Sequence, residues 1–115
     1  MHEFSLAVSM VELAQAAARR EGAERIEAIH VEIGALSGVV PEALEFAFLG
    51  AREGTMAAAA RLEITYRQGV AFCAACQTEF VIDNRFGIAV CPTCEVPSAE
   101  LREGREMHVS HLEVA

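Results

Sequence analysis

Four cysteines in two close pairs are the feature that most constrains this 115-residue chain. Two residues lie between Cys73 and Cys76, two lie between Cys91 and Cys94, and 14 residues separate the pairs. Two intervening residues let one tight turn direct both sulfurs at the same metal ion. Two such turns supply the four thiolates of a tetrahedral site, which zinc usually occupies. The pattern therefore predicts a zinc site with four cysteine ligands.

The same cysteines allow three other interpretations: a pair of disulfides, a redox couple and an iron site of the rubredoxin type. A thioredoxin-like redox motif needs one Cys-x-x-Cys at a strand-to-helix junction rather than two facing copies. Iron in four thiolates has the same geometry as zinc, so the spacing leaves iron open. Four protein ligands leave no coordination position for a water, which predicts a structural rather than a catalytic metal.

Outside the cysteine region, apolar residues follow helical and strand periods in turn. Three- and four-residue spacing predicts helices over residues 5–21 and 41–50, and alternation predicts strands over 29–33, 61–67 and 106–114. We expect an α+β fold in which two helices cover a three-stranded sheet. A zinc-ribbon-like lobe is expected as an insertion between the second and third strands.

The chain is expected to divide into an α/β domain, residues 1–69 with 106–115, and a zinc-binding lobe, residues 70–105. The lobe is too small to bury much apolar surface, so most of its folding free energy is expected to come from the metal. Within it, the run Phe80–Ile82 favours the first strand of a short hairpin.

Capping residues predict where the elements end. Ser5 is expected to cap the start of the first helix, Gly22 to end it, and Pro41 to open the second helix. Residues 51–60 fit either a helix tail or a packed turn. In the last strand the apolar parity changes, which predicts a β-bulge near Ser110.

The charge balance excludes several classes of partner. Nine Arg and no Lys stand against 17 acidic residues, for a net charge of −8. A nucleic-acid or anionic-membrane surface needs a cationic patch, so neither partner is expected. There is no apolar run of the ~18 residues that a bilayer span requires. The start lacks the basic region of a secretory signal, so we expect a cytoplasmic protein. We also expect either a monomer or a weak homodimer.

The first residues, Met1-His2-Glu3, offer a second candidate metal site. An α-amine, a deprotonated backbone amide and an imidazole nitrogen can close fused chelate rings on one ion. Four nitrogens in a plane suit Ni²⁺ or Cu²⁺. The alternative interpretation is a frayed terminus with no ligand.

Taken together, these motifs resemble the HypA/HybF family of nickel metallochaperones for [NiFe]-hydrogenase maturation. The resemblance covers essentially the whole chain, and its N-terminal and cysteine motifs are specific in combination. It rests on Met1–Ser5, Ile33–Ser37, Pro41-Glu42, the four cysteines with Cys91-Pro92, and Gly104–Glu106.

The resemblance implies that residues 1–69 with 106–115 bind nickel. The implied nickel ligands are His2, through its ring and amide nitrogens, with the Met1 amine and the Glu3 backbone amide as further donors. The implied zinc ligands are the four cysteines. Ni²⁺ is then the transported ion and Zn²⁺ the structural one. The implied partners are a maturation GTPase and the hydrogenase large-subunit precursor.

One departure from the family concerns an acidic ligand that some members add before the second helix. Here Val39-Val40 are apolar, and Glu42 is the nearest carboxylate. Its ordinary role is that of an acid in the first turn of a helix. His30, His108 and His111 are expected to be surface side chains rather than ligands.

The chain shows no Ser/His/Asp arrangement, no glycine-rich phosphate loop and no paired carboxylates with the signature of a pocket. We therefore expect a protein that is not an enzyme, with any GTP hydrolysis belonging to its partner. The competing hypothesis is a zinc-ribbon adaptor that mediates protein contacts and transports no metal.

Overall fold

The computed structural model describes residues 2–84 and 87–115 and divides the chain into two compact units. The first, here called the helical unit, comprises the residues up to Glu32 with Val39–Thr65 and His108–Ala115. The second, the cysteine unit, comprises Ile33–Gly38 and Tyr66–Met107. Neither helix within the described residues has an apolar stretch long enough to cross a bilayer.

Helix α1 (His2–Arg20) turns one apolar face inward. Its buried residues recur at the three- and four-residue spacing that was predicted: Ala7, Met10, Val11, Ala14 and Ala18. The helix begins three residues before the predicted start, so the expectation that Ser5 caps it is wrong. No helix breaker precedes Ser5, and Glu3 in the first turn suits the positive end of the helix dipole.

The end of α1 follows the prediction. Gly22 has a φ of +70°, a conformation that glycine adopts without steric cost. The amide of Gly22 donates to the carbonyl of Arg19 and that of Ala23 to the carbonyl of Ala18, both at 3.0 Å. These two hydrogen bonds are those of a Schellman motif, which stops the helix and satisfies its last carbonyls.

Helix α2 (Pro41–Ala51) opens with Pro41, as predicted, after Val40 in an extended conformation. Its buried residues are Leu44, Ala47 and Phe48. Beyond it, residues 52–59 form turns rather than a continued helix, which settles the question left open for residues 51–60. Ala57 and Ala60 are fully buried there, because only a small side chain lets these turns pack closely.

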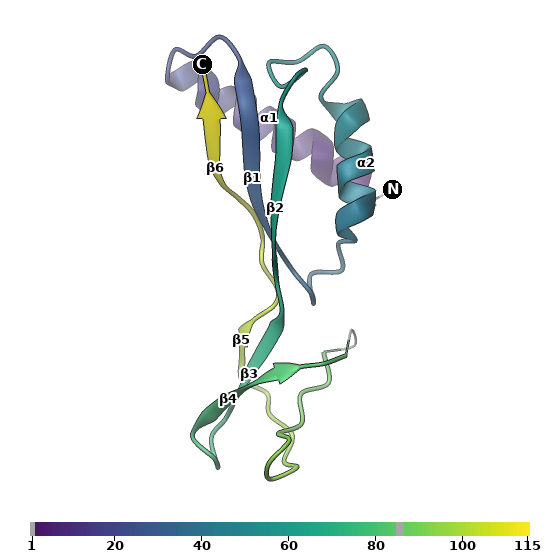
Figure 1. Cartoon of the computed structure of the whole chain (residues 1–115), viewed down its shortest axis with the longest axis vertical. Coiled ribbons are helices and arrows are strands. Elements are labelled where there is room, and N and C mark those ends of the chain that lie inside the picture. The colour runs from purple at the N-terminus through teal and green to yellow at the C-terminus, as the bar shows by residue number, and fades with distance from the viewer. Residues whose placement is uncertain (1, 85–86) are drawn as a thin grey trace. The chain divides into compact units, whose positions relative to one another are not determined.

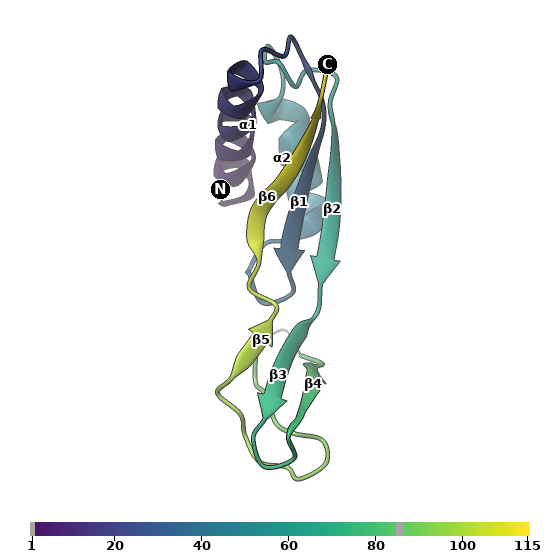
Figure 2. The same ribbon diagram turned by 90° about the vertical axis from the view of Figure 1, so that its left-hand side faces the viewer.

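The sheet of the helical unit is built from β1 (Ile26–Gly34), β2 (Arg61–Arg67) and β6 (Met107–Val114), in the order β2-β1-β6. Both helices lie on one face of this sheet, α1 and α2 side by side (Figures 1 and 2). Ile29, Val31 and Ile33 are buried, as their alternation with polar residues predicts. The predicted α+β fold, with two helices on a three-stranded sheet, is confirmed.

The other face of this sheet is polar and carries three histidines. His108 Nε2 lies 3.6 Å from a carboxylate oxygen of Glu32, and the His111 ring stacks on the His30 ring with centroids 3.9 Å apart. His30 and Glu32 are two residues apart on β1 and so point to the same side. His108 and His111 therefore contact residues on the same side of β1, although strict alternation would direct two strand residues three apart to opposite faces.

The cysteine unit has a three-stranded antiparallel sheet of its own, ordered β4-β3-β5. It comprises β3 (Gly69–Cys73), β4 (Thr78–Ile82) and β5 (Leu101–Glu103). The sequence predicted only the strand at Phe80–Ile82, as the first strand of a hairpin. These residues belong to β4, which is the second strand of the hairpin formed with β3. The strands β3 and β5 are five and three residues long, too short for alternation to be recognised in the sequence.

Candidate metal centres

The four cysteine sulfurs of the cysteine unit converge on one point. The Sγ atoms of Cys73, Cys76, Cys91 and Cys94 all lie within 4.8 Å of one another. The Sγ atoms of Cys73 and Cys94 are 3.5 Å apart, and those of Cys91 and Cys76 are 3.9 Å apart. Four ligands at the usual Zn–S distance in a tetrahedron have sulfurs about 3.8 Å apart. The sulfurs are thus spaced for one tetrahedral metal ion.

None of the four cysteines forms a disulfide. The shorter of the two sulfur separations above, 3.5 Å, is far beyond the ~2.05 Å of an S–S bond. The disulfide interpretation therefore does not describe this structure. The geometry suits zinc and iron equally, because both accept four thiolates in a tetrahedron.

Each cysteine pair sits on a tight turn of the same design. Cys73 ends β3, and the amide of Cys76 donates to its sulfur at 3.4 Å. In the second turn the amide of Glu95 donates to the carbonyl of Cys91 at 2.8 Å. The residue after each pair, Gln77 or Glu95, has a positive φ of 55° or 61°. This left-handed residue redirects the chain out of the turn and leaves both sulfurs on its inner side.

These two left-handed positions were not identified from the sequence. Glycine is the residue that signals a positive φ, and here glutamine and glutamate occupy those positions instead. A signal was nevertheless present, since each residue directly follows a Cys-x-x-Cys pair whose two sulfurs must share a turn.

The electrostatics of the cluster favour a bound cation. Hydrogen bonds with other thiols, that of Cys94 first and then that of Cys73, raise the pKa of Cys76 to about 12. Backbone amides of Cys94 and Thr93 lower the pKa of Cys91 to about 6. Such close sulfurs repel when several are ionised, and a divalent cation removes that repulsion. The donor set therefore fits a thiolate-binding metal ion.

The ligand sulfurs also belong to the core of the cysteine unit. Cys73 and Cys91 are buried together with Ala71, Phe80 and Ile82. Cys76 and Cys94 pack against this cluster and are half-buried. A metal here would join the end of β3 to the turn that begins at Cys91, which is the position of a structural ion.

The second candidate centre lies at the start of α1 in the helical unit. The predicted Met1 amine falls outside the described residues. His2 is the first residue of α1, its side chain is 58% exposed, and its Nδ1 lies 3.9 Å from Glu3 Oε2. The first amides of a helix have no carbonyl partner within the helix. The amide nitrogens of His2 and Glu3 therefore take no part in the hydrogen bonds that later amides donate within the helix.

The Glu3 side chain connects the two helix starts. It is only 14% exposed, and its Oε2 accepts a hydrogen bond from the amide of Val40 at 3.5 Å. Val40 is the residue that precedes α2 and carries no side-chain cap of its own. Glu3 thus fixes the first turn of α1 against the N-terminus of α2, with the His2 ring on the exposed side.

The other candidate side chains are not gathered at these centres. Glu42 lies in the first turn of α2, where an acid suits the helix dipole. His30 contacts Glu113, with Nε2 2.6 Å from Oε2, on the polar face of the sheet. Among the described residues, the cysteine quartet is the one group of three or more His, Cys, Asp or Glu whose ligand atoms lie close enough to hold an ion.

Comparison with known proteins agrees with both the fold and the metal chemistry. Residues 1–114 match the family model described as HypA, hydrogenase/urease nickel incorporation metallochaperone. The hydrogenase maturation factor HypA of Chloroflexus aurantiacus is 42% identical over 113 residues, covering 98% of each chain. That of Dechloromonas aromatica is 38% identical over 114 residues, covering 99% of each chain.

Solved structures give the same assignment. The solution structure of the Ni metallochaperone HypA from Helicobacter pylori has a TM-score of 0.67 and 26% identity, and covers 97% of this chain and 96% of its own. A second HypA solution structure has a TM-score of 0.67 at 28% identity and covers 100% of this chain and 97% of its own. With a family model spanning almost the whole chain and full-length relatives well above 30% identity, this chain belongs to the HypA family.

Proposed function

We propose that this chain is a nickel metallochaperone that binds Ni²⁺ at its N-terminus and delivers it, with a partner GTPase, to the [NiFe]-hydrogenase large-subunit precursor. The observation that carries the proposal is membership of a nickel-incorporation family over residues 1–114, which include the Met1-His2-Glu3 start. The protein acts in the cytoplasm, as a monomer or a weak homodimer, and has no catalytic activity of its own.

The proposed nickel ligands are the ring and amide nitrogens of His2, the Met1 amine and the Glu3 backbone amide. Support comes from the exposed His2 ring and from the unpaired amides expected at the start of a helix. An all-nitrogen plane suits Ni²⁺. A site at an exposed chain end also suits a cargo ion, because a recipient can reach it. Nickel is expected within the part formed by residues 1–69 with 106–115.

The proposed ion at Cys73, Cys76, Cys91 and Cys94 is Zn²⁺, and its role is structural. Support comes from the sulfur spacing and from the burial of two of the ligands in the core of the cysteine unit. When bound, the ion would hold residues 70–105 in a fixed conformation without offering an open coordination position.

Nickel titration of three proteins tests the cargo site: the chain with its native terminus, His2→Ala, and the chain with an N-terminal extension. Both changes are expected to abolish stoichiometric nickel binding in calorimetry, since one removes the ring nitrogen and the other displaces the terminal amine. Zinc content and far-UV circular dichroism should stay unchanged. His111→Ala is the matched control, because it removes an exposed histidine from the polar face of the sheet.

Equal nickel uptake by all these proteins would remove the N-terminal assignment. If the native chain itself bound no nickel while it retained zinc, the zinc-ribbon adaptor would become the better description. A positive result with the native chain and His111→Ala, together with loss in His2→Ala, distinguishes the carrier from the adaptor.

A further inference from the structure

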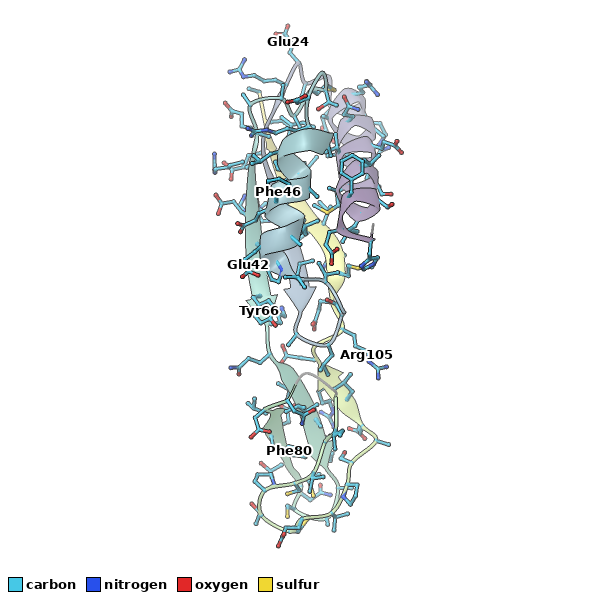
Figure 3. The ribbon with its side chains drawn as sticks, turned by 90° about the vertical axis from the view of Figure 1, so that its right-hand side faces the viewer. Glu24, Glu42, Phe46, Tyr66, Phe80 and Arg105 are labelled. Carbon is cyan, nitrogen blue, oxygen red and sulfur yellow. The ribbon has the colours of Figure 1, made fainter. Side chains whose placement is uncertain are left out.

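Helix α2 presents an apolar pair to solvent. Phe46 is 80% exposed and Leu49 is 51% exposed. Together with Glu42 they follow the spacing i, i+4 and i+7, which places these three along one side of the helix. Glu53 lies in the turn after α2 and lines a hollow with Phe46 and Leu49. Figure 3 shows Glu42 near the start of α2 and Phe46 one turn later, away from the packed side. We call these four residues and Glu45 the α2 face.

Two hollows flank this apolar pair. One, with a volume of about 560 Å³, runs from α2 to the start of β2 and includes Phe46, Leu49 and Leu62 in its wall. The other, of about 270 Å³, lies toward α1 and includes Phe46, Leu49 and Phe4. Phe46 and Leu49 therefore form a ridge between two grooves. Helices pack by fitting the ridges of one into the grooves of another, so this relief suits a helix.

Three glutamates border the ridge, while Arg61, which lines the larger hollow, is paired with Glu63 and Glu113. Glu42, Glu45 and Glu53 lie at its two ends and along its side. The nearby cation Arg52 is turned inward: it donates to the carbonyl of Ala60, and its guanidinium lies 5.8 Å from the centre of the Phe48 ring. An apolar ridge with an acidic border complements a helix whose apolar residues are bordered by Lys or Arg.

A second copy of this chain does not complement the charge of the α2 face. In a two-fold symmetric dimer the patch would meet itself, so the glutamates of one copy would face those of the other. The chain as a whole carries a net charge of −8, which adds to this repulsion. The charge pattern therefore favours a different, basic partner.

The α2 face also lies next to the proposed cargo site. Phe4, which lines the smaller hollow, is in the first turns of α1 only two residues from His2. Glu3 hydrogen-bonds to the amide of Val40, directly before α2. A partner seated on the ridge would thus contact the chain within one helical turn of the proposed nickel donors.

We infer that the α2 face is the docking site for a helix of the partner GTPase, one that presents apolar residues to Phe46 and Leu49 and Lys or Arg to the three glutamates. The inference rests on the proposed function and names the surface on which that function depends. Binding there places the GTPase beside the N-terminus that carries the nickel.

The test measures the affinity of the purified maturation GTPase from the same genome for the full-length chain and its variants, by calorimetry. Phe46→Ala is expected to weaken binding at least about tenfold, the loss typical of a central apolar anchor. Leu13→Ala is the matched control: Leu13 is a 59% exposed leucine on α1, outside the α2 face, and its loss should leave affinity unchanged. Both variants should keep the circular dichroism of the wild type and its nickel stoichiometry.

A second comparison tests the charge. Glu42→Arg with Glu45→Arg should slow association with the GTPase several-fold at low salt, with the difference shrinking as salt rises. The control is Glu24→Arg with Glu27→Arg, which makes the same charge change on exposed residues outside the face. Equal slowing by both pairs would mean that net charge alone matters, and would overturn the charge-matched helix.

The outcomes separate this inference from the proposed function. If the GTPase binds wild type and Phe46→Ala equally, the docking site is wrong while nickel delivery stands. If it binds wild type but the ridge variant instead loses concentration-dependent self-association, the face is a homodimer surface and the inference fails. If it does not bind wild type at all, both the partnership and the docking site fail, whatever the nickel titration of His2→Ala shows.

Discussion

Gly34 shows how a single missing side chain shapes the cysteine unit. A Cβ atom added there would lie 2.1 Å from the carbonyl oxygen of Gly104, a backbone atom that cannot rotate away. The Gly34 amide donates to the carbonyl of Glu106 at 2.8 Å, and the amide of Leu36 donates to Gly104 at 2.7 Å. Two backbone segments therefore approach each other more closely than any residue with a side chain allows.

Gly34→Ala is expected to destabilise the cysteine unit by about 3 kcal/mol, because the backbone must shift and its hydrogen bonds weaken. The measurement is the urea midpoint of the zinc-bound protein. Gly50→Ala is the matched control: it lies in α2, and its added Cβ would meet only a Phe4 ring carbon at 3.8 Å. That variant should be stabilised by about 0.5–1 kcal/mol through helix propensity. Equal stability of the two variants would contradict the close approach.

Among single residues, the sequence identified those whose type and position indicate one particular role. It missed those whose type is common in many environments. The metal site was predicted because few other environments use two Cys-x-x-Cys pairs. Gly22 was predicted to end the first helix because glycine is common at that position. Ser5 was assigned a capping role that it does not have, because serine is common inside helices as well as before them. Gln77 and Glu95 were missed because neither residue type signals a positive φ.

At the scale of elements, the polar face of the sheet is held by a charged cluster that joins all three strands. Glu113 on β6 accepts hydrogen bonds from Arg61 on β2 at 2.9 and 3.0 Å, and contacts His30 on β1 at 2.6 Å. The hydrogen bond with His30 and then that with Arg61 hold the pKa of Glu113 below its usual range. The same carboxylate raises the pKa of Arg61.

The lowered pKa of Glu113 predicts an acid-sensitive contribution to stability. A carboxyl group whose pKa is lower in the folded than in the unfolded state stabilises the fold above its unfolded pKa, about 4.5. That contribution disappears as the pH falls through the folded pKa. Glu113→Gln should therefore lower the urea midpoint at pH 6, and its difference from wild type should vanish with acidification below pH ~4.

Glu24→Gln controls for the loss of one negative charge, because Glu24 is exposed outside this cluster. Its urea midpoint relative to wild type should not reproduce the pH profile of Glu113→Gln. A constant difference between wild type and Glu113→Gln from pH 6 to pH 3 would show that the carboxylate acts by packing rather than by its charge.

Elements with a long, clear period were predictable, and short ones were not. Both helices and the three strands of the helical unit were found from spacing, since the apolar residues of each repeat with the period of its secondary structure. Strands β3 and β5 escaped because their length allows only a few inward residues. Their positions depend on the register with β4 and on the cysteine cluster, which are non-local interactions.

At the scale of the whole molecule, the two units differ in what stabilises them. The helical unit buries large side chains from α2 and β1, among them Phe48, Leu44, Ile29 and Ile26. Among the described residues, the buried cluster of the cysteine unit comprises five side chains, and two of these are the proposed ligands Cys73 and Cys91. The sequence could predict this difference, because the density of apolar residues falls where the cysteines begin.

Removing one ligand should therefore unfold one unit and spare the other. Cys91→Ser is expected to lose zinc. The charge of the remaining thiolates is then no longer neutralised, and the apolar core of the cysteine unit is too small to hold the fold without the ion. Amide hydrogen exchange should show loss of protection in β3 and β4 while α1, α2 and β1 stay protected, because the core of the helical unit contains none of the ligands.

The matched control is Ala74→Ser, which places the same hydroxyl on an exposed, non-ligand position of the first cysteine turn and should retain both zinc and protection. Chelation of zinc from wild type should reproduce the exchange pattern of Cys91→Ser, since both remove the same cross-link. Loss of protection throughout α1 and α2 in the variant would show that the helical unit depends on the metal. Unchanged protection in β3 and β4 after zinc loss would show that the ion is dispensable for the fold, and its assignment as structural would then be wrong.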